Sequence, residues 1–377
     1  MKVKINDTRD FAQKLNALSQ NIVKSPMPIL ECVLIETIDD NSIVCTINNI
    51  QSAAKITFPA QVEEPGCIAV VGKMFANIVN KMPTNKPLSI EGQETIKLNG
   101  GRVKFELTAQ NAEGFPKLKT LKEASSFKIP LDVLKDLTAK ISSFAAKNEE
   151  KRPILKGLLF QIAEKKLDVV ASDGHRLGVK SVNVDAEDGK AIISAEQLNK
   201  MLKTVGKTMQ DEDITVKFDS STCQICGENT ILQITLYFGE FLKYDTIMSA
   251  ELSDIINVNK SELMEVLERA ELVINSELSS NLKVPLKLEY SSGTTMNITT
   301  SVMRSRFSEE ISIDIKQKKS SDDPFVIGIN CTFLKEALQC CHSETVTLGF
   351  THKTGSVFII PETEGEKYMI LPVRLYN

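Results

Sequence analysis

A short pattern of apolar residues recurs along the chain and constrains its fold more than any other feature. In three places, a strand-like residue is followed by apolar residues at offsets of five, eight and nine. These offsets are typical of a buried strand residue followed by one face of an amphipathic helix. The three copies align without a gap: Val70 with Phe75, Ile78 and Val79; Ile193 with Leu198, Met201 and Leu202; Ile329 with Leu334, Ala337 and Leu338.

Three further copies of the pattern lie about 65 to 71 residues upstream of the first three. They are Ile5 with Phe11 and Leu15, Ile129 with Leu134 and Leu137, and Val258 with Leu263, Val266 and Leu267. We therefore predict strand–helix halves, two of which make a domain, and three repeated domains in the chain. Six similar amphipathic helices could also arise by chance, but gapless copies at correlated spacings favour a repeat.

Polar stretches separate the predicted domains, which we place at residues 1–122, 123–251 and 252–377. The longer spacing in the third domain is explained by a polar insertion at Lys316–Pro324, which we interpret as an exposed loop. Runs such as Asn41–Ile47, Lys166–Ala171 and Val284–Tyr290 alternate in polarity and contain many β-branched residues. They predict antiparallel strands with one buried face, and hence an α+β fold.

Composition and cysteine usage are those of an ordinary globular protein. Of the 377 residues, 42% are hydrophobic and 25% are charged, and the first residues contain no apolar signal segment. We therefore expect a cytoplasmic protein. Among the eight cysteines, only Cys223-Gln-Ile-Cys226 has the spacing of metal ligands, and no second such pair accompanies it. We interpret these cysteines as reduced structural residues, and we expect no metal or other cofactor.

The charge balance restricts the possible nucleic-acid partners. The net charge is −4 and the isoelectric point is about 5.7, whereas a protein that simply coats DNA is usually basic. Lysines nevertheless recur in the helix sequences, for example Lys14 and Lys24 in the first and Lys73 and Lys81 in the second. A solvated helix face would explain such lysines as well as a DNA-facing one, so charge alone leaves both interpretations open.

Several short segments resemble the bacterial sliding clamp family, the beta subunit of DNA polymerase III. The resemblance is strongest at Arg152–Gly157 and at Ala171-Ser-Asp-Gly-His-Arg-Leu177, and the C-terminal Tyr368–Leu375 is similar to the terminal strand of the family. Weaker matches complete the resemblance, which covers the whole chain in order: Pro28–Leu30, Phe105–Leu107 and Gly114–Pro116.

The resemblance implies a non-catalytic processivity factor for DNA replication. Two copies would form a head-to-tail homodimer ring, with helices lining a hole around duplex DNA and antiparallel sheets outside. Contacts with DNA would be independent of its sequence and would involve Lys24, Lys73 and Arg152. The dimer interface would contain Phe105, Leu107, Leu272 and Val273.

The resemblance also implies a groove for linear peptides from the replicative polymerase, the clamp loader and repair proteins. The expected groove combines the 172–177 loop, the segment around residue 242 and a terminal strand from Met369 to Leu375. Its residues would be Leu155, Ser172, Gly174, His175, Arg176, Leu177, Leu242, Ile247, Ser356, Met369, Ile370, Leu371, Pro372, Val373, Arg374 and Leu375.

The chain departs from the pattern of the family at several positions. Leu242 stands where a proline forms one wall of the groove, and Asp245-Thr246 and Ser194–Glu196 stand where basic residues are common. These departures leave open a divergent clamp paralogue, or a repeat scaffold that binds peptides without encircling DNA.

An enzyme is the third alternative, namely a hydrolase or transferase that uses Asp173, His175 and Arg176. We disfavour it because no Ser or Cys nucleophile lies near these residues in the sequence and no Gly-rich phosphate loop is present.

Overall fold

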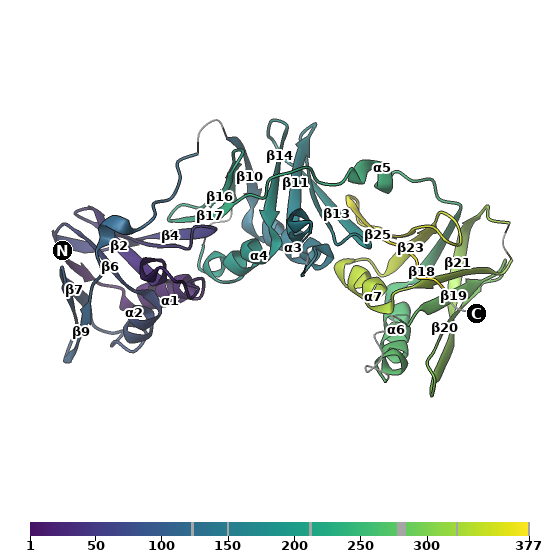
Figure 1. Ribbon diagram of the computed structural model, residues 1–377, viewed down its shortest axis with the longest axis horizontal. Coiled ribbons are helices and arrows are strands. Elements are labelled where there is room, and N and C mark those ends of the chain that lie inside the picture. Colours follow the sequence, from purple (N-terminus) through teal and green to yellow (C-terminus); the bar gives the residue numbers. More distant parts are fainter. Residues whose placement is uncertain (122–123, 149–150, 211–212, 277–283, 322, 376–377) are drawn as a thin grey trace. The chain divides into compact units, whose positions relative to one another are not determined.

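The computed structural model describes residues 1–121, 124–148, 151–210, 213–276, 284–321 and 323–375. Its contacts divide the chain into two compact units, which we describe separately (Figure 1). The first unit contains Met1–Thr138, Ile162–Lys165 and Val184–Phe238; the second contains Ala139–Gln161, Lys166–Asn183 and Gly239–Asn377. The first of the predicted boundaries, at residues 122 and 123, lies outside the described residues.

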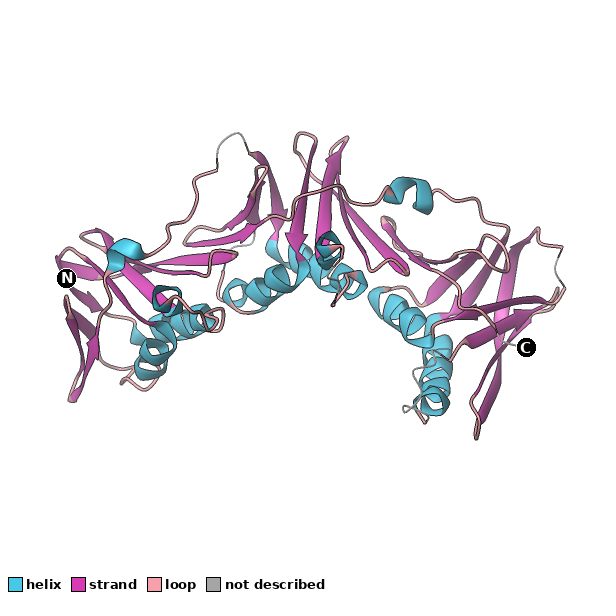
Figure 2. Ribbon diagram, in the orientation of Figure 1, coloured by secondary structure: helices cyan, strands magenta, loops and turns pink. Residues whose placement is uncertain are grey.

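Every predicted strand–helix pair is present (Figure 2). The apolar residues that defined the repeat are buried, apart from the half-buried Ile78. The short helix α5 was not predicted. The helices are α1 (Thr8–Ser19), α2 (Gly72–Val79), α3 (Leu131–Ile141), α4 (Ala195–Lys203), α5 (Tyr244–Met248), α6 (Lys260–Asn275) and α7 (Cys331–Cys340).

Polar caps explain where four of these helices begin. The side chain of the residue before each helix accepts a hydrogen bond from a backbone amide of the first turn, which otherwise has no partner within the helix. The capping residues are Asp7 for α1, Ser194 for α4, Asn259 for α6 and Asn330 for α7.

The first unit contains two antiparallel sheets, with strand orders β5-β1-β7-β8-β9 and β10-β15-β16-β17-β4-β3-β2-β6. Helices α1 and α2 pack against each other in this unit. The strands are β1 (Lys2–Ile5), β2 (Cys32–Asp39), β3 (Ser42–Asn48), β4 (Ser52–Pro59), β5 (Gln61–Glu64), β6 (Cys67–Val71), β7 (Leu88–Gly92), β8 (Thr95–Gly100), β9 (Val103–Thr108), β10 (Ser125–Pro130), β14 (Gly189–Ser194), β15 (Asp213–Phe218), β16 (Thr222–Cys226) and β17 (Thr230–Thr235).

In the second unit, antiparallel strands follow the order β12-β13-β25-β24-β23-β18-β21-β20-β19-β22. Strand β21 extends to Lys318, so the predicted loop at residues 316–324 begins too early, and its residue 322 lies outside the described residues. The strands are β11 (Gly157–Ala163), β12 (Lys166–Ser172), β13 (Arg176–Asn183), β18 (Asp254–Asn259), β19 (Leu286–Tyr290), β20 (Thr295–Ser301), β21 (Arg306–Lys318), β22 (Phe325–Ile329), β23 (Thr345–Phe350), β24 (Val357–Pro361) and β25 (Glu366–Ile370).

Strand pairs join the repeats into continuous sheets. In the first unit, β17 pairs with β4, for example Leu232 with Ala54. In the second unit, β13 pairs with β25, for example Leu177 with Met369. Each repeat therefore meets its neighbour in the chain through backbone hydrogen bonds.

A buried carboxylate organises the start of the C-terminal repeat. Asp254 is fully buried; its Oδ2 accepts hydrogen bonds from the Tyr290 hydroxyl at 2.9 Å and the Ser320 hydroxyl at 2.5 Å. Its Oδ1 accepts the backbone amides of Lys319 and Ser320. Burial acts to raise the pKa of Asp254, but these hydrogen bonds outweigh it and hold the pKa below its usual range.

We predict that Asp254→Asn lowers the free energy of unfolding by ~1–3 kcal/mol at pH 7, because it leaves buried donors poorly satisfied. The pKa of Asp254 is lower in the folded than in the unfolded protein. Ionised Asp254 therefore stabilises the fold at pH values above the unfolded pKa, and this stabilisation is lost as pH falls through the folded pKa. Urea denaturation of both proteins at neutral pH and below pH ~4 should show the difference shrinking in acid. A difference that grows in acid would contradict this assignment.

Candidate functional site

The loop between β12 and β13 is fixed by its own side chains. Asp173 Oδ1 accepts the backbone amides of His175 at 2.9 Å and Arg176 at 3.0 Å. The Ser172 hydroxyl donates to the Arg176 carbonyl at 2.8 Å and accepts the Gly174 amide at 3.1 Å. Gly174 has φ +87°, which favours glycine. The loop therefore presents His175 on a rigid turn.

Arg176 anchors this loop to the rest of the second unit. Its side chain is buried, and Nε donates to Asp173 Oδ2 at 2.9 Å. Nη2 donates to the Ser143 carbonyl at 2.6 Å, and Nη1 donates to Glu336 on α7. The guanidinium also lies over the rings of Phe144, at 5.2 Å, and Phe333, at 4.3 Å. Buried Arg176 therefore holds the loop in place through its contacts with Asp173, Ser143 and Glu336.

Sequence reasoning missed most of the Arg176 partners. The spacing of Asp173 and Arg176 is a signal for an ion pair, since acid and base three residues apart can meet in a turn. Nothing in the sequence points to Phe333 or Glu336, which are about 160 residues away along the chain. Only the tertiary fold brings them to the loop.

The C-terminal segment lies beside this loop. Strand β25 pairs with β13, placing Ile370 opposite Arg176, and the Leu371 amide donates to the His175 carbonyl at 2.8 Å. The predicted terminal strand is wrong in its extent, since β25 ends at Ile370 and residues 371–375 have no regular structure. Beyond it, the Val373 amide donates to the Gly328 carbonyl of β22 at 2.8 Å, so the chain end lies beside that strand.

The predicted groove residues separate into a buried foundation and an accessible rim. The foundation consists of Leu155, Ser172, Arg176, Leu177, Met369 and Ile370, all of which are buried. The rim consists of the exposed or half-buried residues Gly174, His175, Leu242, Ile247, Ser356, Leu371, Pro372, Val373, Arg374 and Leu375. Leu371, which is 40% exposed, is the rim's most exposed large apolar side chain among those described. Accessible apolar side chains such as Leu371 on a buried base can contact an apolar side chain of another molecule.

Leu242 and Ile247 lie in the segment that connects the middle and C-terminal repeats. Gly239, at φ +128°, begins this segment and passes close to the Ile154 side chain, next to Leu155. Helix α5 follows and carries the half-buried Ile247.

The three residues predicted to contact DNA lie in different elements of the fold. Lys24 was expected in the first helix, but α1 ends at Ser19 because the chain turns at Gln20, so Lys24 lies in the following loop. Lys73 lies on α2, and both lysines are exposed. Arg152 is exposed too, and its guanidinium lies close to Gly174, at the groove loop.

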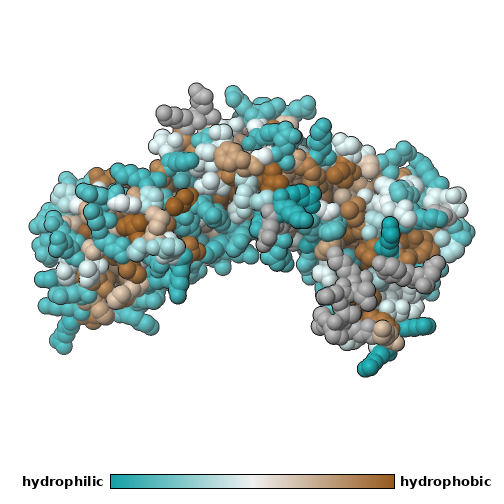
Figure 3. Space-filling model, viewed as in Figure 1, coloured by the Kyte–Doolittle hydropathy of each residue, from teal (hydrophilic) through white to brown (hydrophobic). Residues whose placement is uncertain are grey.

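The predicted dimer residues are only partly accessible. Phe105 on β9 is 38% exposed, whereas Leu107 is buried in its own unit. On α6, Leu272 is 73% exposed and Val273 is half-buried. The surface in Figure 3 is mostly hydrophilic with separate apolar patches. No helix among the described residues is long and apolar enough to cross a membrane.

The enzyme interpretation fails on geometry. Both carboxylate oxygens of Asp173 are bonded to its own turn or to Arg176, so Asp173 does not serve His175 as an acid–base partner. A metal site at the Cys223–Cys226 pair is disfavoured too, because residues three apart on β16 point to opposite faces. Burial also raises the pKa of the Cys223 thiol, which disfavours the metal-binding thiolate.

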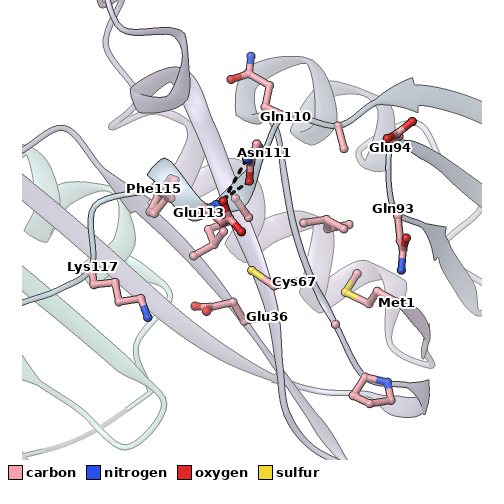
Figure 4. A pocket seen from close by; sticks show the side chains of 16 residues that line it. Met1, Glu36, Cys67, Gln93, Glu94, Gln110, Asn111, Glu113, Phe115 and Lys117 are labelled. Carbon is pink, nitrogen blue, oxygen red and sulfur yellow. Dashed lines mark hydrogen bonds between the residues drawn. The ribbon is translucent and has the colours of Figure 1, made fainter.

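A cavity of about 880 Å³ lies in the first unit, and none of the predicted site residues lines it (Figure 4). Its lining includes Glu36, Cys67 and Glu113, and the Glu113 amide donates to Asn111 Oδ1 at 2.9 Å. Burial, reinforced by Glu36, raises the pKa of the Cys67 thiol to about 11. The thiol is therefore protonated at neutral pH and is a poor nucleophile.

Family models match nearly the whole chain. The N-terminal, central and C-terminal domain models of the DNA polymerase III beta subunit match residues 1–119, 128–243 and 245–374, respectively.

Relatives and solved structures agree with these matches. The chain is 25% identical to the beta sliding clamp of Chlamydia muridarum over 366 residues, 95% of each chain. It is 25% identical to that of Streptococcus pneumoniae serotype 4 over 378 residues, 97% of each chain. The crystal structure of a putative DNA polymerase III beta subunit from Eubacterium rectale superposes with a TM-score of 0.89 at 25% identity, covering 100% of both chains. The beta subunit from Pseudomonas aeruginosa, at 18% identity and a TM-score of 0.89 with the same coverage, shares the fold.

We predict that Arg176→Met lowers the free energy of unfolding by ~2–4 kcal/mol, because it leaves Asp173 and Glu336 without their cation. Urea denaturation measures the change. His175→Ala, at the exposed neighbouring position, is the matched control and should cost less than ~0.5 kcal/mol. Equal losses in the two variants would show that Arg176 does not anchor the loop.

Proposed function

Since this chain belongs to the DNA polymerase III beta subunit family, the non-catalytic beta sliding clamps that act as processivity factors in DNA replication, we propose that two copies close into a ring around duplex DNA. The ring tethers the replicative polymerase to its template. It needs no strong DNA contact, because a closed ring cannot leave the duplex sideways. This topology reconciles a net charge of −4 with a DNA partner.

Unpaired strand edges support the head-to-tail homodimer. The repeats within one chain are joined by the pairs β4–β17 and β13–β25. Strand β9 is the outermost strand of its sheet. Residues Arg306–Ser312 of β21 pair with β20 on one side, and no strand among the described residues pairs with their other side. Pairing β9 of one chain with this edge of its partner repeats the joint already used twice, and removes two exposed edges.

Side chains near the two edges suit such an interface. Leu272 on α6 is exposed, and the neighbouring Arg269 forms two hydrogen bonds with Glu309 of β21, at 2.8 and 2.6 Å. This ion pair ties α6 to the strand that would join the partner. On β9, Phe105 offers the apolar surface, while the buried Leu107 would contribute its backbone. We assign the interface to Phe105, Leu107, Leu272 and Val273.

Phosphate contacts would be few and independent of DNA sequence. We assign them to the exposed Lys24 and Lys73. The family resemblance also implies that Arg152 contacts DNA. Its guanidinium lies beside Gly174, so Arg152 can contact the groove loop as well.

The groove would bind linear peptides from the polymerase, the clamp loader and repair proteins. The rim around His175 and Leu371 supports this assignment, because it offers accessible apolar side chains such as Leu371 and is built on buried residues. Apolar burial is worth ~25 cal/mol per Å², and ordering the peptide offsets part of the gain, so we expect a Kd in the micromolar range.

The domains that carry these functions are proposed at residues 1–122, 123–251 and 252–377. The family matches change between residues 119 and 128, which includes the first proposed boundary, and at residues 243–245, a few residues before the second. Replication of a bacterial chromosome would place the protein in the cytoplasm.

We predict that Leu272→Ala combined with Val273→Asp raises the dimer dissociation constant at least ~100-fold, because an unpaired carboxylate would be buried at the interface. Light scattering coupled to size exclusion gives the molar mass. Ile38→Asp changes an exposed apolar residue on β2 and should leave the dimer intact. Dimers in both variants would contradict the interface.

The topological function predicts that protein loaded on nicked circular DNA stays bound until the circle is linearised, and then slides off. Lys24→Glu with Lys73→Glu should shorten retention, because the reversed charges repel phosphate. A double variant with the same charge change, Lys165→Glu with Lys190→Glu, is the control. Gel filtration of the protein–DNA mixture measures retention. Equal retention on circles and linear DNA would favour a peptide-binding scaffold that does not encircle DNA.

A further inference from the structure

We propose that Tyr244 and Asp168 are positioning residues for the peptide groove. The hydrogen bond between their side chains holds helix α5, and α5 holds Leu242 and Ile247 on the rim. This inference rests on the proposed peptide groove and adds two residues that do not line it.

Helix α5 depends on external contacts for its position. It has five residues, and an isolated helix of this length is unstable in water. The Tyr244 amide donates to the Leu242 carbonyl at 2.9 Å, and Ile247 lies one turn further along. A displacement of Tyr244 therefore moves both rim residues.

Tyr244 attaches the helix to the middle repeat. Its side chain is buried, and its hydroxyl donates to Asp168 Oδ2 on β12 at 2.9 Å. Asp168 is itself fixed, because its Oδ1 accepts the Ser181 hydroxyl at 2.6 Å and lies 3.4 Å from the Lys166 ammonium. The acceptor is thus held ready for the tyrosine hydroxyl.

A second contact attaches the other end of α5 to the C-terminal repeat. The Lys367 ammonium on β25 donates to the Met248 carbonyl and lies 4.6 Å from the centre of the Phe358 ring. Helix α5 thus bridges β12 and β25, two strands of the sheet that carries the groove.

An open pocket beside the helix adds to the importance of these polar contacts. It has a volume of about 510 Å³, and its lining includes Val179, Ser181, Met248 and Glu366. Close packing that would otherwise fix the helix is therefore incomplete on this side. Without the Tyr244 hydrogen bond, α5 would spend more time away from the position that completes the rim.

The apparent peptide affinity is proportional to the fraction of molecules with a complete rim, so it falls when that fraction falls. The loss of one buried hydrogen bond, about 1 kcal/mol, can lower the attached fraction of α5 at most about fivefold, so Tyr244→Phe and Asp168→Ala should each weaken peptide binding measurably but by no more than about fivefold. The double variant should bind no more weakly than either single variant, because both remove the same bond. Asp168→Asn keeps an acceptor oxygen and should restore most of the affinity.

The test uses full-length protein and a fluorescein-labelled peptide that contains Gln-Ala-Ser-Leu-Phe, of the Gln-x-x-Leu-Phe type that the family resemblance implies, and follows binding by fluorescence anisotropy. A matched control is available in the same unit: the Tyr290 hydroxyl donates to the buried Asp254, also at 2.9 Å. Tyr290→Phe should lower the melting temperature but leave peptide affinity unchanged. Hydrogen exchange of the amides at 245–249 reports directly on α5.

Weaker binding and faster α5 exchange in Tyr244→Phe, with neither change in Tyr290→Phe, would support the inference. Unchanged affinity in Tyr244→Phe, or an equal loss in Tyr290→Phe, would overturn it while leaving the groove in place. Failure of the wild-type protein to bind the peptide would refute the groove itself, and the inference with it.

Discussion

The pairing of β13 with β25 is the interaction on which the candidate site depends. It brings a loop of the middle repeat beside a segment almost 200 residues further along the chain. At one position of this ladder, Lys180 faces Glu366, and their charged groups lie 2.8 Å apart with both residues buried. Such a pair is costly to bury, and moving the two strands apart would leave each charge without its partner. The register of the ladder is thereby fixed, and with it the alignment of His175 and Leu371.

The residues of the candidate site fall into a structural group and a group that can contact a ligand. Buried residues such as Arg176 and Leu177 hold its shape, whereas exposed residues such as Leu371 are free to meet another molecule. This division explains why a charged residue in a family motif need not touch a ligand. The donors of Arg176 are directed to Asp173, Ser143 and Glu336 within the protein.

The repeat made most of the fold predictable, because burial of one helix face and one strand face imposes periodicities that can be read from sequence. Ile329, for example, is the last residue of β22, and Leu334 is buried near the start of α7, as their spacing predicted. Helix α5 could not be predicted, since its position depends on tertiary contacts of Tyr244 and Lys367 rather than on a periodic apolar face. The groove residues came from resemblance to a family, and which of them are buried depends on contacts between segments far apart in sequence.

Joints between repeats of one chain differ from a joint between two chains in a way that bears on how a ring would open. The pairs β4–β17 and β13–β25 each connect strands of one chain, so separated strands stay within reach of each other. Their effective concentration is on the order of millimolar, and they re-form without a second molecule. A joint between two chains has no such tether once the ring has opened fully. Opening would thus begin at the subunit boundary, and the fraction of protein in free rings would fall on dilution while each chain kept its own joints.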